Sequence, residues 1–130
     1  MAKYAYPAVF TKEDEGYSVI FRDLESCYTC GSDMEEALEM AEDVLALVLY
    51  GYEKESKEIP VPSAYESIKL DENEFVNHIR CDTLAYRKMY ANKAVKKTLT
   101  IPEWLNEESV SKGVNFSKVL QEALIKEVGV

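Results

Sequence analysis

The sequence predicts an α+β protein in two parts, with the order β-β-β-α-β plus a short helix in the first part and β-α-α in the second. Short runs of aromatic and β-branched residues near the N-terminus predict strands, and a long stretch with apolar residues at helical spacing predicts a helix. The last forty residues combine an alternating segment with two short helical patterns. With 130 residues, of which 47% are hydrophobic, the chain can form a packed core.

Two strands are expected near the N-terminus, over residues 3–10 and 17–21. The polar run 11–16 supplies a turn, so the two strands should pair as a hairpin. Pro7 cannot donate a ladder hydrogen bond, so we expect the first of them to be an edge or irregular strand.

A third short strand over residues 27–30 leads into the clearest element, a long helix for which Asp33 offers the N-cap oxygen. One face of this helix should pack on the sheet, and the other is strongly acidic. The apolar face comprises Ala37, Leu38, Ala41, Val44, Leu45, Val48, Leu49 and Tyr52. The acidic arc comprises Glu35, Glu36, Glu39, Glu42 and Asp43.

Residues 59–63 contain two prolines and are expected to form a connection rather than a helix. We expect a fourth strand over 75–81 and then a helix over 83–90 with Asp82 as its N-cap. A helix then covers one face of a mainly antiparallel sheet, and residues 91–93 form a hinge to the second part.

The second part should begin with a strand over residues 96–101 that leads into a helix with Pro102 at its first position. Gly113 suits the left-handed position after that helix, and Asn115 suits the N-cap of the next. So short a segment cannot bury its apolar side chains alone, so we expect it to dimerise through a paired ribbon of strands and intertwined helices. The expected dimerisation core comprises Leu99, Ile101, Trp104, Leu105, Phe116, Val119, Leu120, Ala123 and Leu124.

The outer face of such a ribbon fits the major groove of DNA, where lysine reaches guanine acceptors and threonine contacts base edges. Backbone N–H groups at the start of the last helix should bind a phosphate. The alternative is a dimerisation hairpin whose polar face lies in water. The expected DNA-binding residues are Lys96, Thr98, Thr100, Asn115, Phe116, Ser117 and Lys118.

The two parts differ in charge and should therefore face different partners. Residues 1–90 contain nine Lys or Arg and nineteen Asp or Glu, a net charge of −10, whereas residues 91–130 contain six Lys and five Glu, a net charge of +1. No acidic residue occurs between positions 83 and 102, where five are basic. This basic stretch suits a phosphate backbone, or equally a solvated linker.

Catalytic and metal sites are not expected. Asp14, Asp23 and Asp43 are the carboxylates that a nuclease would use, but their positions in a turn, at a strand end and on an acidic helix face favour solvated acids.

The ligand types of a zinc site occur at Cys27, Cys30, His78 and Cys81. Residues three apart in a strand point to opposite faces and cannot hold one ion. We therefore expect Cys27 and Cys81 to pack as small apolar residues, His78 to lie at the surface, and the three thiols to stay reduced.

Several segments together resemble HicB antitoxins. In the first part they are residues 6–10, 16–21, 23–24, Cys27, Gly31, 35–38 and 82–87, and in the second they are 97–105, 113–117 and 120–124. The sequence departs from the family at Arg22, Glu25 and Ser26, where proline, proline and glycine are common, so this loop is expected to differ in shape. Ser109 replaces a frequent alanine.

The resemblance implies a degenerate RNase H-like domain over residues 1–90 and a ribbon-helix-helix domain over 91–130. It implies that the first binds and masks a HicA-type, RNA-cleaving toxin and that the second forms a homodimer on the operator DNA of its own operon, with further assembly into tetramers left open. The protein would be a cytoplasmic non-enzyme without cofactor or membrane partner. The alternative is an orphan transcriptional regulator whose first domain senses a ligand or another protein.

Overall fold

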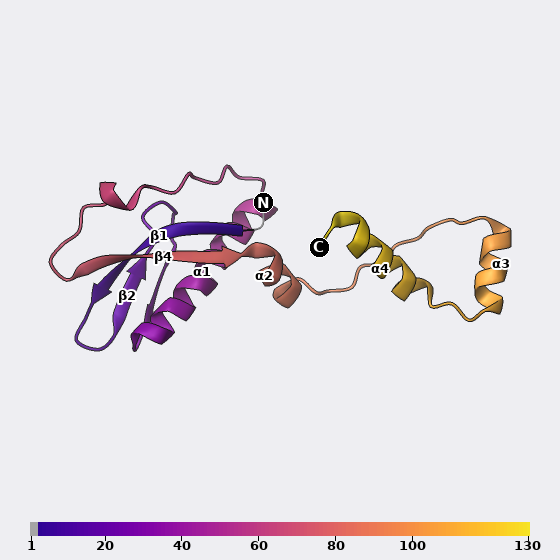
Figure 1. The fold of residues 1–130 in the computed structure, drawn as a ribbon, viewed down its shortest axis with the longest axis horizontal. Helices are drawn as coiled ribbons and strands as arrows, with labels where there is room; N and C mark the ends of the chain where they lie inside the picture. The colour runs from indigo at the N-terminus through magenta and orange to yellow at the C-terminus, as the bar shows by residue number, and fades with distance from the viewer. Residues whose placement is uncertain (1–2) are drawn as a thin grey trace. The chain divides into compact units, whose positions relative to one another are not determined.

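The computed structural model describes residues 3–130, which divide into two compact units, the second beginning at Ala94 (Figure 1). The predicted order β-β-β-α-β followed by a short helix is confirmed in the first unit, with an additional 3₁₀ helix, η1. Its elements are β1 (Lys3–Lys12), β2 (Tyr17–Ile20), β3 (Tyr28–Gly31), α1 (Met34–Lys54), η1 (Tyr65–Ser67), β4 (Glu74–Asp82) and α2 (Thr83–Tyr90). The second unit contains α3 (Glu103–Ser111) and α4 (Phe116–Val128).

The four strands form one antiparallel sheet in the order β3-β2-β1-β4. The prediction that Pro7 marks an edge strand is wrong for β1 as a whole, because β1 lies between β2 and β4. Strand β2 pairs only with the stretch from Val9 to Lys12, whereas β4 pairs with β1 along almost its whole length. The half of β1 that holds Pro7 therefore has a strand on one side only, which is where a proline is tolerated.

Helix α1 covers one face of this sheet, and the core lies between them (Figure 1). Successive strand residues point to opposite faces, so Tyr6, Ala8 and Phe10 of β1 all reach α1. The predicted apolar face of α1 is correct except at Leu38, which is 38% exposed, while Ala46 is buried in the core. Leu38 lies only one turn from the start of α1, and the sequence pattern does not show where the sheet beneath the helix ends.

The start of α1 lies directly on the end of β3. Asp33 is the N-cap as predicted, and its carboxylate accepts a hydrogen bond of 2.8 Å from the N–H of Glu36. In return the Glu36 carboxylate accepts one of 3.1 Å from the N–H of Ser32. Gly31 fits beneath this turn, and a Cβ atom there would lie 2.3 Å from the backbone nitrogen of Ala37.

The part of the connection from α1 to β4 that holds Tyr65 packs on the opposite face of the sheet. The ring of Tyr65 meets His78 edge-on at 5.8 Å, and His78 alternates with the inward-facing Ile79 along β4. The connection is fixed by Asp23, whose carboxylate accepts hydrogen bonds from the backbone N–H and the hydroxyl of Ser63. Asp23 is therefore not the solvated acid that the sequence predicted.

The loop between β2 and β3 is closed by a hydrogen bond of 2.9 Å from the Phe21 N–H to the Cys27 carbonyl. Ser26 in this loop has a φ of 52°, in the left-handed region that favours glycine. Arg22 reaches out of the loop and donates to the Lys69 carbonyl at 2.7 Å. Ser26 thus adopts a backbone conformation that glycine takes up more readily than serine does.

In the second unit, the helix ends match the sequence at Gly113 and Asn115. Gly113 has a φ of 66°, and the N–H groups of Gly113 and Val114 donate to the carbonyls of Val110 and Ser109, which is a Schellman motif. Pro102, expected at the first helical position, is instead the N-cap residue of α3. The difference is one residue, and Pro102 has an extended ψ of 144°.

The strand expected over residues 96–101 is not formed within the described chain, where residues 91–102 are neither helix nor strand. A strand exists only through hydrogen bonds to a neighbouring strand. The predicted strand is expected to pair with the same segment of a second copy of the chain, and a single copy has no such partner.

The contact between β3 and α1 gives a direct test of the fold. Gly31→Ala should lower the free energy of unfolding by about 2–3 kcal/mol, because its new methyl group overlaps backbone atoms of Ala37 that cannot rotate away. Gly51→Ala in α1 is the matched control, since a Cβ there has no atom within 4 Å and alanine favours helix by about 0.5–1 kcal/mol. Urea unfolding measures both, and equal stability of the two variants would contradict the described packing.

Candidate functional site

The second unit exposes the apolar side chains that the sequence assigned to a dimerisation core. Neither α3 nor α4 has a buried residue, and Leu99, Trp104 and Val119 are 60%, 66% and 53% exposed. Helices with an apolar stripe need a surface to cover it, because each exposed large side chain forgoes about 1.5–3 kcal/mol of burial.

A groove of about 610 Å³ runs along this unit, and most residues of the predicted dimerisation core line it. Trp104 lines a neighbouring depression instead, and Leu124 lines neither. The apolar residues that line the groove are Leu99, Ile101, Leu105, Val114, Phe116, Val119, Leu120 and Ala123.

The predicted DNA-reading residues lie on the other side of the same segment. Lys97, Leu99 and Ile101 line the groove, and the alternating positions Lys96, Thr98 and Thr100 are exposed and do not line it. An extended segment with this alternation presents Lys96, Thr98 and Thr100 on the side opposite to Lys97, Leu99 and Ile101.

The start of α4 departs from the prediction in one respect. The N–H of Lys118, expected to be free for a phosphate, donates at 3.1 Å to the side-chain oxygen of its own N-cap, Asn115. The groups that remain for an external acceptor are the N–H groups of Phe116 and Ser117, which have no intrahelical partner by their position in the first turn. The side-chain oxygen of Asn115 therefore caps this helix start.

In the first unit, a second and smaller groove of about 360 Å³ lies between β3, α1 and α2. Two rings of α2 form one wall. Tyr86 packs on Tyr90 with ring centroids 4.7 Å apart and on Tyr50 of α1 at 5.5 Å. The residues that line it are Thr29, Met40, Asp43, Val44, Leu47, Tyr86 and Tyr90.

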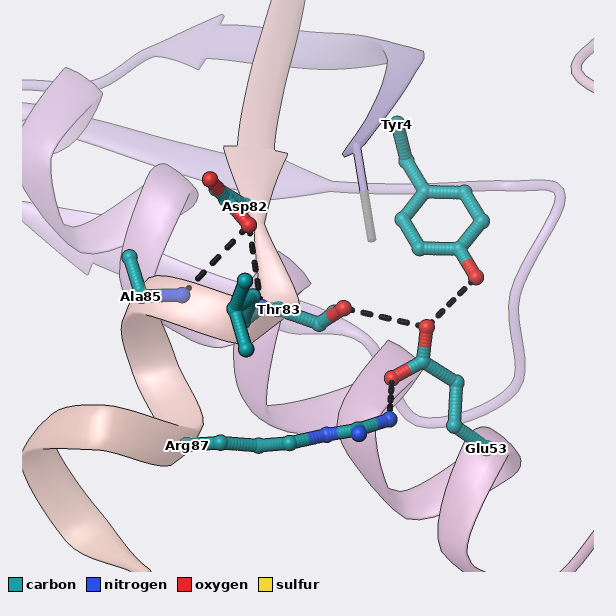
Figure 2. A network of polar contacts seen from close by, with 7 residues as sticks. Tyr4, Glu53, Asp82, Thr83, Ala85 and Arg87 are labelled. Atoms are coloured by element: carbon teal, nitrogen blue, oxygen red, sulfur yellow. Dashed lines mark hydrogen bonds and ion pairs between the residues drawn. The ribbon is translucent and has the colours of Figure 1, made fainter. Parts of the chain in front are cut away.

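A polar network fixes α2 beside the end of α1 (Figure 2). Its centre is the Glu53 carboxylate, which accepts hydrogen bonds from the Tyr4 hydroxyl at 2.6 Å, the Thr83 hydroxyl at 3.0 Å and the Arg87 guanidinium at 2.6 Å. Asp82 caps the start of α2 as predicted, at 2.9 Å from the Leu84 N–H. The network joins β1, α1 and α2, the last of which carries the tyrosine wall.

The protonation of this network follows from burial and from its donors. Burial by itself raises the pKa of Glu53, but hydrogen bonds from Tyr4, Arg87 and Thr83 together with the charge of Arg87 lower it below its ordinary 4.5. Burial, with the bond to Glu53, raises the pKa of Tyr4 to about 12. Glu53 is therefore charged and Tyr4 neutral at neutral pH.

Two of the three cysteines, Cys27 and Cys81, behave as small apolar side chains, as predicted. Cys27 and Cys81 are buried in the core, and burial raises the pKa of each thiol to about 12. Cys30 is exposed, and His78 lies at the surface against Tyr65. Within residues 3–130 no three His, Cys, Asp or Glu side chains lie together in a way that could hold a metal ion.

Residues 3–74 match the family model described as "HicB_like antitoxin of bacterial toxin-antitoxin system". The chain belongs to this HicB-like antitoxin family. Antitoxin HicB 2 of Photorhabdus laumondii is 40% identical over 58 residues, which are 45% of this chain and only 42% of that relative.

Solved structures of HicB antitoxins share the fold. A chain of a toxin-antitoxin complex from Streptococcus pneumoniae is 28% identical and matches with a TM-score of 0.63, covering 96% of this chain and 99% of the other. The Burkholderia pseudomallei antitoxin HicB is 14% identical, with a TM-score of 0.54 over 95% of this chain and 98% of the other. An antitoxin HicB3 is 23% identical, with a TM-score of 0.52 over 96% and 98%. The four-stranded antiparallel sheet with helices is thus the fold of HicB antitoxins.

In the described part of this HicB-like chain, no helix combines the length and the apolar character that crossing a bilayer requires.

The Glu53 network and the tyrosine wall were not found from the sequence. Glu53 follows the apolar face of α1 and has no pattern of its own, because its partners come from residues 49 positions before it and up to 34 after it. The spacing of Tyr86 and Tyr90, four residues apart on a short helix, was the one available signal.

The network predicts a pH dependence of stability. A group whose folded pKa is lowered stabilises the fold above its unfolded pKa, and this contribution is lost as the pH falls through the folded value. Glu53→Gln should therefore lower the free energy of unfolding by about 1–2 kcal/mol at pH 7, with a difference from the unsubstituted protein that shrinks below pH 4.5. Thermal unfolding from pH 3 to 8 measures it, with the exposed Glu58→Gln as control. A difference that does not vary with pH would contradict this role.

Proposed function

We propose that this chain is the antitoxin of a HicA/HicB-type pair. Residues 1–90 bind and mask a HicA-type, RNA-cleaving toxin, and residues 91–130 form a ribbon-helix-helix dimer that binds the operator of its own operon. The observation that carries the proposal is the likeness, over nearly the full length, to a chain of the Streptococcus pneumoniae toxin-antitoxin complex. The net charge of −10 in residues 1–90 supports a basic, RNA-binding partner, because opposite potentials steer and orient such an interface.

Dimerisation is supported by the exposed apolar groove of the second unit. Its lining comes from residues 97–101 and from both helices, so a second copy that pairs its own 96–101 segment as a strand would also cover the groove. The backbone of this segment would gain its ladder partner at the same time. A single dimer would therefore both cover the apolar groove and pair the backbone N–H and C=O groups of residues 96–101.

Operator binding is supported by the alternation in residues 96–101 and by the start of α4. Lys96, Thr98 and Thr100 would enter the major groove from the paired ribbon. The N–H groups of Phe116 and Ser117, with the positive end of the α4 dipole, would bind a phosphate oxygen and set the position of the ribbon on the duplex. The antitoxin acts in both roles by binding, and no catalytic step is proposed.

The antitoxin role is tested by co-expression with the product of the neighbouring reading frame. We expect a stable complex on purification, relief of growth arrest in cells that carry both genes, and suppression of RNA cleavage by the purified toxin. Residues 1–93 alone should retain toxin binding, since the contacts within the first unit are formed without the second. A toxin that cleaves RNA equally well with and without this chain would overturn the proposal.

The DNA-binding role is tested by the double substitution Lys96→Ala and Thr98→Ala. It should weaken operator binding by about 100-fold in a gel-shift assay, because each base contact contributes about 1–3 kcal/mol of discrimination. Toxin binding and the dimer, measured by light scattering, should be unchanged. Lys126→Ala, at the far end of α4, is the charge-matched control. Loss of the dimer instead would mean that the two faces of the strand are reversed.

A further inference from the structure

The smaller groove, between β3, α1 and α2, has an apolar lining of which three large side chains are left exposed by the core. Met40 and Leu47 are 41% and 52% exposed, and Tyr90 is 66% exposed. Met40, Asp43 and Leu47 follow the spacing of one helix face, so α1 carries two exposed apolar side chains and one carboxylate beside Val44, which packs partly against the core. Large apolar side chains grouped in this way on a surface mark an interaction site.

The charges that α1 brings to this groove are acidic, whereas α2 carries the cations Arg87 and Lys88 in its last turn. Asp43 lines it directly, and Glu36 and Glu39 are exposed on α1 one turn before Met40 and Asp43. The nearby cation Arg87 is engaged, since it pairs with Glu53 at 2.6 Å and lies over the Tyr50 ring at 5.6 Å. An apolar groove with an acidic rim selects partners that carry the opposite charge around an apolar anchor.

The groove is also held in shape before any partner arrives. Its α2 wall is fixed to α1 by the Glu53 network and by the contact between the Tyr50 and Tyr86 rings, and Tyr86 packs in turn on Tyr90. Aromatic side chains with restricted rotamers give contact area at a low entropic cost. A wall built in this way needs little ordering when a ligand binds.

We propose that this groove is where the toxin anchors: it receives a large apolar side chain of the toxin that is flanked by lysine or arginine. The inference rests on the proposed antitoxin function and adds the surface and the chemistry of the contact. The apolar anchor fills the space between Leu47, Tyr86 and Tyr90, and the flanking cations reach Asp43 and Glu39, the carboxylate one turn before it. Such central apolar anchors dominate the affinity of protein interfaces.

The apolar contact is tested by Leu47→Asp in the full-length chain. Affinity for the purified toxin from the neighbouring reading frame, measured by biolayer interferometry, should fall at least about 30-fold, because a charge then occupies the position of the anchor. Val61→Asp is the matched control: this valine is 86% exposed, lies in the connection after α1 and does not line the groove. Its affinity should stay within about twofold of the unsubstituted chain.

The charge contribution is tested separately by Asp43→Lys. The control is Glu66→Lys, which makes the same change of charge on the exposed η1. Asp43→Lys should reduce the association rate by about tenfold at low salt, with the difference shrinking as ionic strength rises. Circular dichroism melts of all four variants establish that each is folded.

The outcomes separate the two proposals. No binding by the unsubstituted chain would overturn the antitoxin function itself. If the unsubstituted chain, Leu47→Asp and Asp43→Lys all bind the toxin equally tightly, the antitoxin function stands. The groove is then not the contact surface. A change in the oligomeric state of the free Leu47→Asp variant would assign the groove to a second copy of the chain and would also overturn the inference.

Discussion

The first unit depends on how closely α1 can approach the sheet. Gly31 at the end of β3 and the alanines at positions 37 and 41 keep the contact side of the helix small, so the larger side chains Leu45 and Leu49 fill the core further along. Because the approach is close, the helix is fixed in rotation about its axis. This rotation decides which of its residues face solvent, and it leaves Met40, Asp43 and Leu47 together on the outside.

The Glu53 network extends the same arrangement to the end of the unit. A largely buried carboxylate is stable only when its oxygens are satisfied, and Tyr4, Thr83 and Arg87 do this from β1 and α2. The Glu53 network therefore holds α2 in one position on the first unit, whereas apolar contacts alone would allow several. The tyrosine wall of the smaller groove is a consequence of that position.

The second unit has the opposite problem: it has apolar surface to bury, but no layer of its own against which to bury it. Its two helices are well terminated by the Schellman motif and the Asn115 cap, so their lengths are set locally. Their apolar faces have no layer to pack on within this unit. In the dimer that we propose, a second copy would cover these apolar faces, and the strand that completed the core would also present Lys96, Thr98 and Thr100 on its other side.

The sequence by itself determined the order of the strands and α-helices in the first unit, the caps at Asp33, Asp82 and Asn115, and the termination at Gly113, because these depend on neighbours within a few residues. It also separated the apolar from the acidic side of α1. Only the tertiary structure decided that β1 is a central strand despite Pro7, that Asp23 binds Ser63, and that Glu53 joins three elements. These features depend on groups that are distant in the chain and meet only after packing, so no local pattern encodes them. The groove between β3, α1 and α2 belongs with them, since its position follows from the rotation of one helix and the anchoring of another.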